Sequence, residues 1–226
     1  MRRRIHFSRR RWNLRLLILA LAVVLLLMAL VFGIRACMQK YDRYTTVVYG
    51  VPVHTALIPE GNVARPGITR TIKYVVLHET GNTQKGSNAA AHSTFLLYNN
   101  TSTTSWHYTV DDHEIYHHIP DHEVAWHASD QLTDPGGNLN GIGVELCVNE
   151  DGDFEKTFDN AARLVAYLLQ EYDLDLEDIK QHADFVEKNC PERIRNENRM
   201  EEFRNLVASY MQQGSTEQQK ETDTQE

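Results

Sequence analysis

The chain has 226 residues, a length that suits one domain with short additional segments. Its formal net charge of -8 conceals two unlike parts. Residues 1–40 hold nine of the 23 Lys and Arg and no acid, whereas residues 41–226 carry 14 basic and 31 acidic residues. Such an acidic body excludes nucleic acid as the main partner, because phosphate binding requires a basic surface. The three cysteines are odd in number and widely spaced, so no disulfide framework is expected.

The N-terminal part predicts a membrane anchor. Residues 1–15 contain seven arginines and are expected to form a basic cytoplasmic segment. Leu16 to Ile34 is a run of 19 uncharged, mostly apolar residues, long enough to cross a bilayer as a helix. Residues 16–36 are therefore predicted to form a single-pass transmembrane signal anchor in the cell membrane, with the following domain extracytoplasmic. A cleaved signal peptide is the alternative, although its apolar core is usually shorter.

Three further segments follow the predicted anchor. Residues 37–64 are predicted to be a linker arm, because Pro and Gly recur along them. Within this arm, residues 47–53 are typical of a short edge strand. The folded domain is predicted over residues 65–212. Residues 213–226 contain almost no apolar side chain and are predicted to be a disordered tail.

Strand-like and helix-like segments alternate within the predicted domain. Apolar runs bounded by turn residues predict strands over 73–78, 105–110, 114–119 and 141–148, with a short strand or loop at 179–182. Helical spacing of apolar residues predicts helices over 89–98 and 157–172, and a final helix from Pro191 onward. This alternation indicates an α/β domain, and the pattern leaves the strand directions open.

Two parts of the sequence offer candidate metal ligands. His78 ends an apolar strand just before a Gly-Asn turn, which places an imidazole at the open edge of a sheet. His182 and Cys190 are separated by seven residues, and imidazole and thiolate are both good zinc ligands. A histidine and a cysteine near a helix start are more often structural, so this spacing alone does not establish a metal site.

Two charged residues are candidates for catalysis. Glu145 lies between Val144 and Leu146 in a strand, so alternation places it on the opposite face from both. It is either a solvated carboxylate or a general base held at a site. Lys188, two residues before Cys190, is either a solvated lysine or a cation that stabilises an oxyanion.

Taken together, these motifs resemble those of the zinc-dependent N-acetylmuramoyl-L-alanine amidases of type 2, the bacteriophage-lysin type, over residues 65–195. The resemblance rests on Val-Val-Leu-His78-Glu-Thr-Gly-Asn, Ser105-Trp-His-Tyr108, Ala125-Trp-His-Ala128, Gly141-Ile-Gly-Val-Glu145, and His182 with Lys188-Asn-Cys190-Pro. It implies a central mixed sheet flanked by helices. It also implies one Zn²⁺ ion bound by His78, His182 and Cys190, with Glu145 and Lys188 acting in catalysis.

The same resemblance implies a reaction and a substrate. The expected reaction is hydrolysis of the amide between N-acetylmuramic acid and L-alanine in peptidoglycan, by a catalytic domain expected to be monomeric. Trp106, His107 and His127 are candidate substrate-binding residues, with packing or a supporting hydrogen bond as the alternative for each. Two rival functions stay open: a non-catalytic peptidoglycan-binding module of the same fold, and a hydrolase in which Cys190 is the nucleophile and His182 its partner.

Overall fold

The computed structural model describes residues 16, 18–31 and 45–223. The chain divides into two compact units, one over residues 1–44 and one from Thr45 onward. In the first unit, residues 18–31 are helical. Across the described residues, no helix combines the length and apolarity required to span a bilayer. The predicted basic segment, residue 17 and residues 32–44 lie outside the described part of the chain.

The second unit is built on a seven-stranded mixed sheet in the order β1-β2-β5-β4-β6-β3-β7. Antiparallel pairing joins β1 to β2 and β4 to β5, and the other neighbours are parallel. The strands are β1 (Thr45–Val48), β2 (Val51–Thr55), β3 (Tyr74–Glu79), β4 (Tyr108–Val110), β5 (Ile115–His117), β6 (Gly141–Leu146) and β7 (Ile179–Gln181). This sheet confirms the predicted α/β class and fixes the strand directions that the sequence pattern leaves open.

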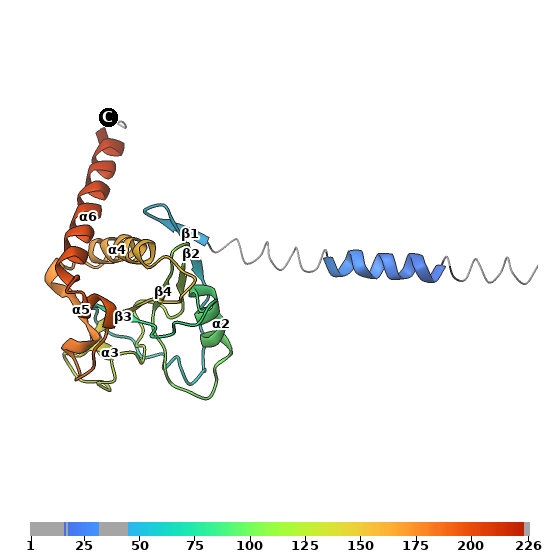
Figure 1. Ribbon diagram of the computed structural model, residues 1–226, viewed down its shortest axis with the longest axis horizontal. Coiled ribbons are helices and arrows are strands. Elements are labelled where there is room, and N and C mark those ends of the chain that lie inside the picture. Colours follow the sequence, from blue (N-terminus) through green and yellow to red (C-terminus); the bar gives the residue numbers. More distant parts are fainter. Residues whose placement is uncertain (1–15, 17, 32–44, 224–226) are drawn as a thin grey trace, which may run out of the picture. The chain divides into compact units, whose positions relative to one another are not determined.

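Helices flank this sheet. They are α2 (Ala89–Tyr98), α3 (Gly137–Asn140), α4 (Phe154–Glu171), α5 (Glu192–Asn196) and α6 (Met200–Asp223), with the 3₁₀ turns η1 (Leu176–Asp178) and η2 (His182–Asp184). The apolar stripe of α4 packs with α6 (Figure 1). Phe158 of α4 and Phe203 of α6 are buried in the same core cluster as Leu77 of β3. The predicted helix over 89–98 is confirmed, and the side chain of Asn88 caps its start.

Residues 45–55 form a β-hairpin that belongs to the sheet, whereas residues 37–64 are predicted to be a linker. Tyr49 and Gly50 make its turn, and both have positive φ angles. β2 pairs with β5, which buries Val51 and Val53 in the main core. The domain therefore begins at Thr45, and the predicted boundary at residue 65 is wrong because it removes two strands from the sheet.

The C-terminal stretch also differs from its prediction. α6 continues to Asp223, so residues 213–223 are helical where a disordered tail is predicted, and residues 224–226 lie outside the described range. This stretch is rich in Gln and Glu, which are good helix formers. Extending an existing helix adds one hydrogen bond per residue and requires no new nucleus, so the extension does not depend on an apolar stripe.

Candidate metal centre and active site

His78 lies near the carboxyl end of β3 and points away from the main core. Side chains alternate along a strand, and Val75 and Leu77 of β3 belong to the core that includes α4. His78 therefore projects from the opposite face, where only 1% of it is exposed. This confirms the predicted position of an imidazole at the end of an apolar strand.

His182 and Cys190 meet His78, although they lie 104 and 112 residues away along the chain. β7 is the neighbour of β3, and His182 follows β7 directly at the start of η2. Nδ1 of His182 is 3.0 Å from Nδ1 of His78, and Sγ of Cys190 is 3.8 Å from that same nitrogen. All three ligand atoms lie within 4.8 Å of one another, and all three side chains are buried. The fold thus brings together the three residues predicted to bind a metal.

This donor set fits zinc. Two imidazole nitrogens and one sulfur are ligands that zinc favours, and three protein ligands are usual in a catalytic site. Burial lowers the pKa of His78 well below its ordinary value, and burial together with the charge of Lys188 lowers the pKa of His182 to about 4. Both imidazoles are therefore neutral near pH 7, the form that binds a metal. Burial raises the pKa of the Cys190 thiol to about 11, so a thiolate there requires the charge of a bound cation.

His127 supports His78 through a hydrogen bond. Its Nδ1 lies 2.9 Å from Nε2 of His78, and its Nε2 lies 3.1 Å from the carbonyl oxygen of Gly141. Because a carbonyl only accepts, Nε2 of His127 donates to it, and Nδ1 of His127 accepts from Nε2–H of His78. Nδ1 of His78 then keeps its lone pair for a metal. This contact matches the alternative given for His127, a supporting hydrogen bond, and its contact with substrate stays a prediction.

Glycine in β6 provides the space that the ring of His127 occupies. A Cβ atom at Gly143 would lie 2.7 Å from Cγ of His127. The N–H of Gly143 also donates to Nδ1 of His107 at 2.9 Å. His107 is completely buried. Its ring therefore packs on the β6 backbone, and its contact with substrate stays a prediction.

Glu145 lies beside His78 on the neighbouring parallel strand. The two residues pair directly in the β3–β6 register, and Oε1 of Glu145 is 4.0 Å from Nδ1 of His78. Its side chain is 13% exposed, and Oε2 has no hydrogen-bond partner among the described residues. Burial raises the pKa of Glu145 to about 8, against the opposing effect of Lys188. Such a carboxyl group exchanges a proton readily near neutral pH, which suits a general acid–base role.

Lys188 is exposed at the edge of a cavity that reaches Cys190. The cavity has a volume of about 500 Å³ and is lined by Lys188 and Cys190 together with Thr80 and Arg193. The charge of Lys188 influences the pKa of Glu145 and of Cys190, which places it within electrostatic reach of both. The cavity therefore gives a molecule from solvent a path to Cys190, one of the three candidate ligands.

Trp106 lies in a second, smaller cavity of about 320 Å³. It shares this cavity with Thr80, His92 and Phe95. The indole is only 7% exposed, and its Nε1–H donates to Oγ1 of Thr109 at 2.6 Å. Packing thus accounts for most of the ring, and its contact with substrate stays a prediction.

Two residues near the centre were not predicted from the sequence. Oδ1 of Asn138 accepts from the backbone N–H groups of His127 and Ala128, each at 2.7 Å, and so fixes the loop that carries His127. Glu79 accepts from two backbone N–H groups at the start of α5. An Asn in a Gly-rich turn and an acid directly after a candidate ligand are the available signals, and both are too common to single out these residues.

Comparison with known proteins identifies the family of the chain. Residues 68–193 match the family Amidase_2, described as N-acetylmuramoyl-L-alanine amidase. The chain belongs to this family. The matched segment contains the three candidate metal ligands and both predicted catalytic residues. The recognition made from the sequence motifs is therefore confirmed.

Individual relatives of the chain carry the same family name. The N-acetylmuramoyl-L-alanine amidase XlyA of Bacillus subtilis (strain 168) is 44% identical over 137 residues, which cover 61% of this chain and 45% of XlyA. The N-acetylmuramoyl-L-alanine amidase CwlH of the same organism is 42% identical over 144 residues, which cover 64% of this chain and 57% of CwlH. The chain therefore spans about half the length of these curated relatives.

Solved structures show the same amidase fold. The catalytic domain of XlyA superposes with a TM-score of 0.66 and 39% sequence identity, covering 70% of this chain and 99% of that domain. PlyL superposes with a TM-score of 0.63 and 27% identity, covering 69% of this chain and 96% of PlyL. The mixed sheet flanked by helices is thus the fold of the family.

Proposed function

We propose that this domain hydrolyses the amide bond between N-acetylmuramic acid and L-alanine in peptidoglycan, with one zinc ion bound by His78, His182 and Cys190. The observation that carries the proposal is the convergence of these three ligand atoms beside Glu145, within a segment that belongs to an amidase family. The relatives XlyA and CwlH are named for this activity, which supports the same bond as the target here.

The chemistry divides between the metal and the chain. A bound zinc ion would polarise the scissile carbonyl and lower the pKa of an adjacent water to about 7. Glu145 would take the proton from that water and deliver it to the leaving nitrogen of L-alanine. Its position beside His78 and its pKa of about 8 suit both transfers, because neither protonation state is far from accessible at neutral pH.

Lys188 would stabilise the negative charge that develops on the carbonyl oxygen. Its exposed side chain lines the cavity that also reaches Cys190, so an ammonium group is available on the substrate side of the centre. Removing one such donor from an oxyanion site typically lowers the rate by about 10²–10³-fold. The cavity of about 500 Å³ would hold the peptide that extends from the cleaved bond.

We also propose that the domain acts outside the cell membrane, where peptidoglycan lies. The support is the sequence alone: basic residues before an uncharged run from Leu16 to Ile34. Protease added to intact protoplasts should degrade the domain. Protection of the domain until the membrane is broken would contradict this location.

The two rival functions are less well supported. A binding module does not require a complete set of metal ligands with a carboxylate beside it, and this chain has both. A nucleophilic cysteine requires a thiolate near neutral pH, whereas burial raises the pKa of Cys190 to about 11. The pKa of Cys190 suits a metal ligand better than a nucleophile.

Incubation of the full chain with purified cell walls tests the proposed reaction. New amino-terminal alanine, identified by mass spectrometry of the released peptides, is the expected product. A chelator should abolish its release, and added zinc should restore it. Wall binding without new amino-terminal alanine would indicate the binding module, and chelator-resistant cleavage that thiol alkylation stops would indicate the cysteine hydrolase.

A further inference from the structure

Glu79 connects the two chain segments that carry His78 and Cys190. It is the last residue of β3 and directly follows His78. Its Oε2 accepts from the N–H of Arg193 at 2.9 Å, and its Oε1 accepts from the N–H of Ile194 at 3.0 Å. These two amides lie in the first turn of α5, which begins two residues after Cys190. One carboxylate thus joins backbone segments that lie 114 residues apart in sequence.

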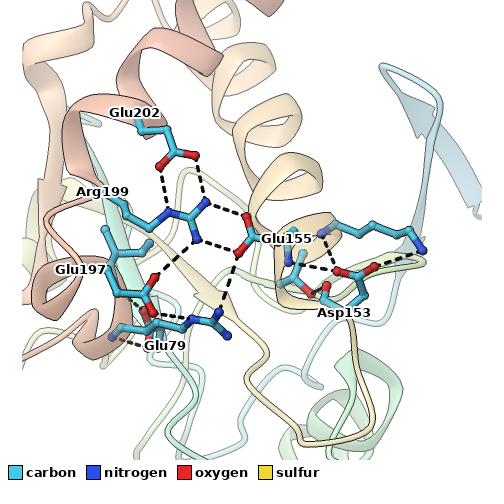
Figure 2. A network of polar contacts seen from close by, with 10 residues as sticks. Glu79, Asp153, Glu155, Glu197, Arg199 and Glu202 are labelled. Carbon is cyan, nitrogen blue, oxygen red and sulfur yellow. Dashed lines mark hydrogen bonds and ion pairs between the residues drawn. The ribbon is translucent and has the colours of Figure 1, made fainter.

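The other contacts of α5 do not reach β3 through polar side chains. Arg193 lies 3.7 Å from Glu155 of α4 and 3.1 Å from Glu197, and Arg199 pairs with Glu155 and Glu202 (Figure 2). Arg193 joins α5 to α4 through Glu155, whereas Arg199 follows α5 and pairs with Glu155 and with Glu202 of α6. None of these pairs includes a residue of β3. Glu79 is the acid in this network that belongs to the strand of His78 (Figure 2).

Glu79 is poorly placed to bind substrate itself. It lines the same cavity as Lys188, but each of its oxygens already accepts a backbone N–H. A bidentate contact of this kind fixes the side chain and the two amides relative to each other. Movement of α5 away from β3 would therefore have to break both hydrogen bonds, and Cys190 precedes these amides by only three and four residues.

We propose that Glu79 is a positioning residue that holds Cys190 at its distance from His78 and thereby sets the affinity of the centre for zinc. The proposal rests on the zinc site of the proposed function and adds a residue outside the ligand set. Residues that orient metal ligands typically contribute about 10–100-fold to metal affinity. Glu79 acts on Cys190 through the backbone of α5 and does not contact the metal.

Asp153 provides a matched control for the loss of such a carboxylate. It caps α4 by accepting from the N–H groups of Glu155 and Lys156, at 3.1 and 3.3 Å, and is labelled in Figure 2. Glu79→Ala and Asp153→Ala each remove a carboxylate that accepts two backbone N–H groups at a helix start. Both should lower the Tm, because both leave helix N–H groups unpaired. Only Glu79→Ala should affect the metal centre.

The first measurement is zinc affinity of the full chain by competition with a chromophoric chelator. Glu79→Ala should weaken binding about 10–100-fold, and Glu79→Gln by less, since one amide oxygen can still accept. Asp153→Ala should bind zinc like the wild type. Equal zinc affinity in wild type, Glu79→Ala and Glu79→Gln would overturn the proposal, and if Glu79→Ala fails to fold, Glu79→Gln against Asp153→Ala decides it.

A second measurement requires no metal and separates this proposal from the proposed function. Cys190 is 5% exposed, so its alkylation in the metal-free protein reports how firmly α5 is held. Glu79→Ala should speed alkylation of Cys190 at least tenfold, whereas Asp153→Ala should leave the rate unchanged. A wild type that binds no zinc would contradict the proposed function alone. Unchanged alkylation of Cys190 in the Glu79 variants would contradict the positioning role.

Discussion

At the scale of single residues, the site depends on which atoms are free to react. The hydrogen bonds from His78 through His127 to the Gly141 carbonyl leave Nδ1 of His78 with its lone pair. Oε2 of Glu145 has no hydrogen-bond partner in the described structure. The strand that carries Glu145, β6, pairs with β3 and β4. A mostly buried carboxylate without a partner is costly, so its retention here is explained by a task.

Replacement of Glu145 tests that task. Glu145→Gln keeps the shape of the side chain but cannot take up a proton, so kcat for wall cleavage should fall by about 10²–10⁴-fold. Zinc content and wall binding should not change, because Glu145 is not among the three ligands. Metal analysis and release of amino-terminal alanine measure the two effects separately.

Glu150→Gln is the matched control for this substitution. Glu150 is also acidic and lies shortly after β6, but its side chain is 71% exposed and pairs with Lys85. The Glu150→Gln variant should cleave walls at the wild-type rate. Retained turnover in Glu145→Gln would remove Glu145 from the mechanism.

At the scale of elements, the N-terminal hairpin completes the sheet. The repeated Pro and Gly of residues 37–64 favour a linker, and local composition cannot reveal that β2 finds a partner in β5, about 60 residues later. By contrast, β3 and β6 are predictable because each is a long apolar run. The sequence predicts a single edge strand over residues 47–53, whereas Tyr49 and Gly50 form a turn there between two short strands. The pairing of β2 with β5 is non-local, so the local pattern does not reveal it.

Removal of the hairpin tests its place in the domain. Val51 and Val53 are buried in the main core, and exposing two such side chains costs about 3–6 kcal/mol. This is a large part of the roughly 5–15 kcal/mol by which domains are stable. A chain of residues 65–226 should therefore be unfolded or melt far below a chain of residues 45–226 in thermal denaturation. Equal Tm values for the two chains would show that the hairpin is dispensable.

At the scale of the whole molecule, the centre exists only because the sheet order β6-β3-β7 brings distant segments together. The identities of His78, His182, Cys190 and Glu145 were predictable, because the family motifs surround them in the sequence. The burial of His107 and His127 was not, although both follow a tryptophan in similar motifs. The burial of His127 depends on space above a glycine of β6, which is a property of the fold and not of the motif.

The zinc content of the full chain tests the central claim most directly. It is measured in variants of Cys147 and Cys190, the two cysteines that are buried in the described structure. Cys190 is a predicted ligand, whereas Cys147 is equally buried in a separate apolar cluster. Wild type and Cys147→Ser should each hold one zinc ion per chain, and Cys190→Ser should lose it or bind it at least 100-fold more weakly. One zinc ion at wild-type affinity in Cys190→Ser would contradict the assignment of His78, His182 and Cys190 as the metal centre.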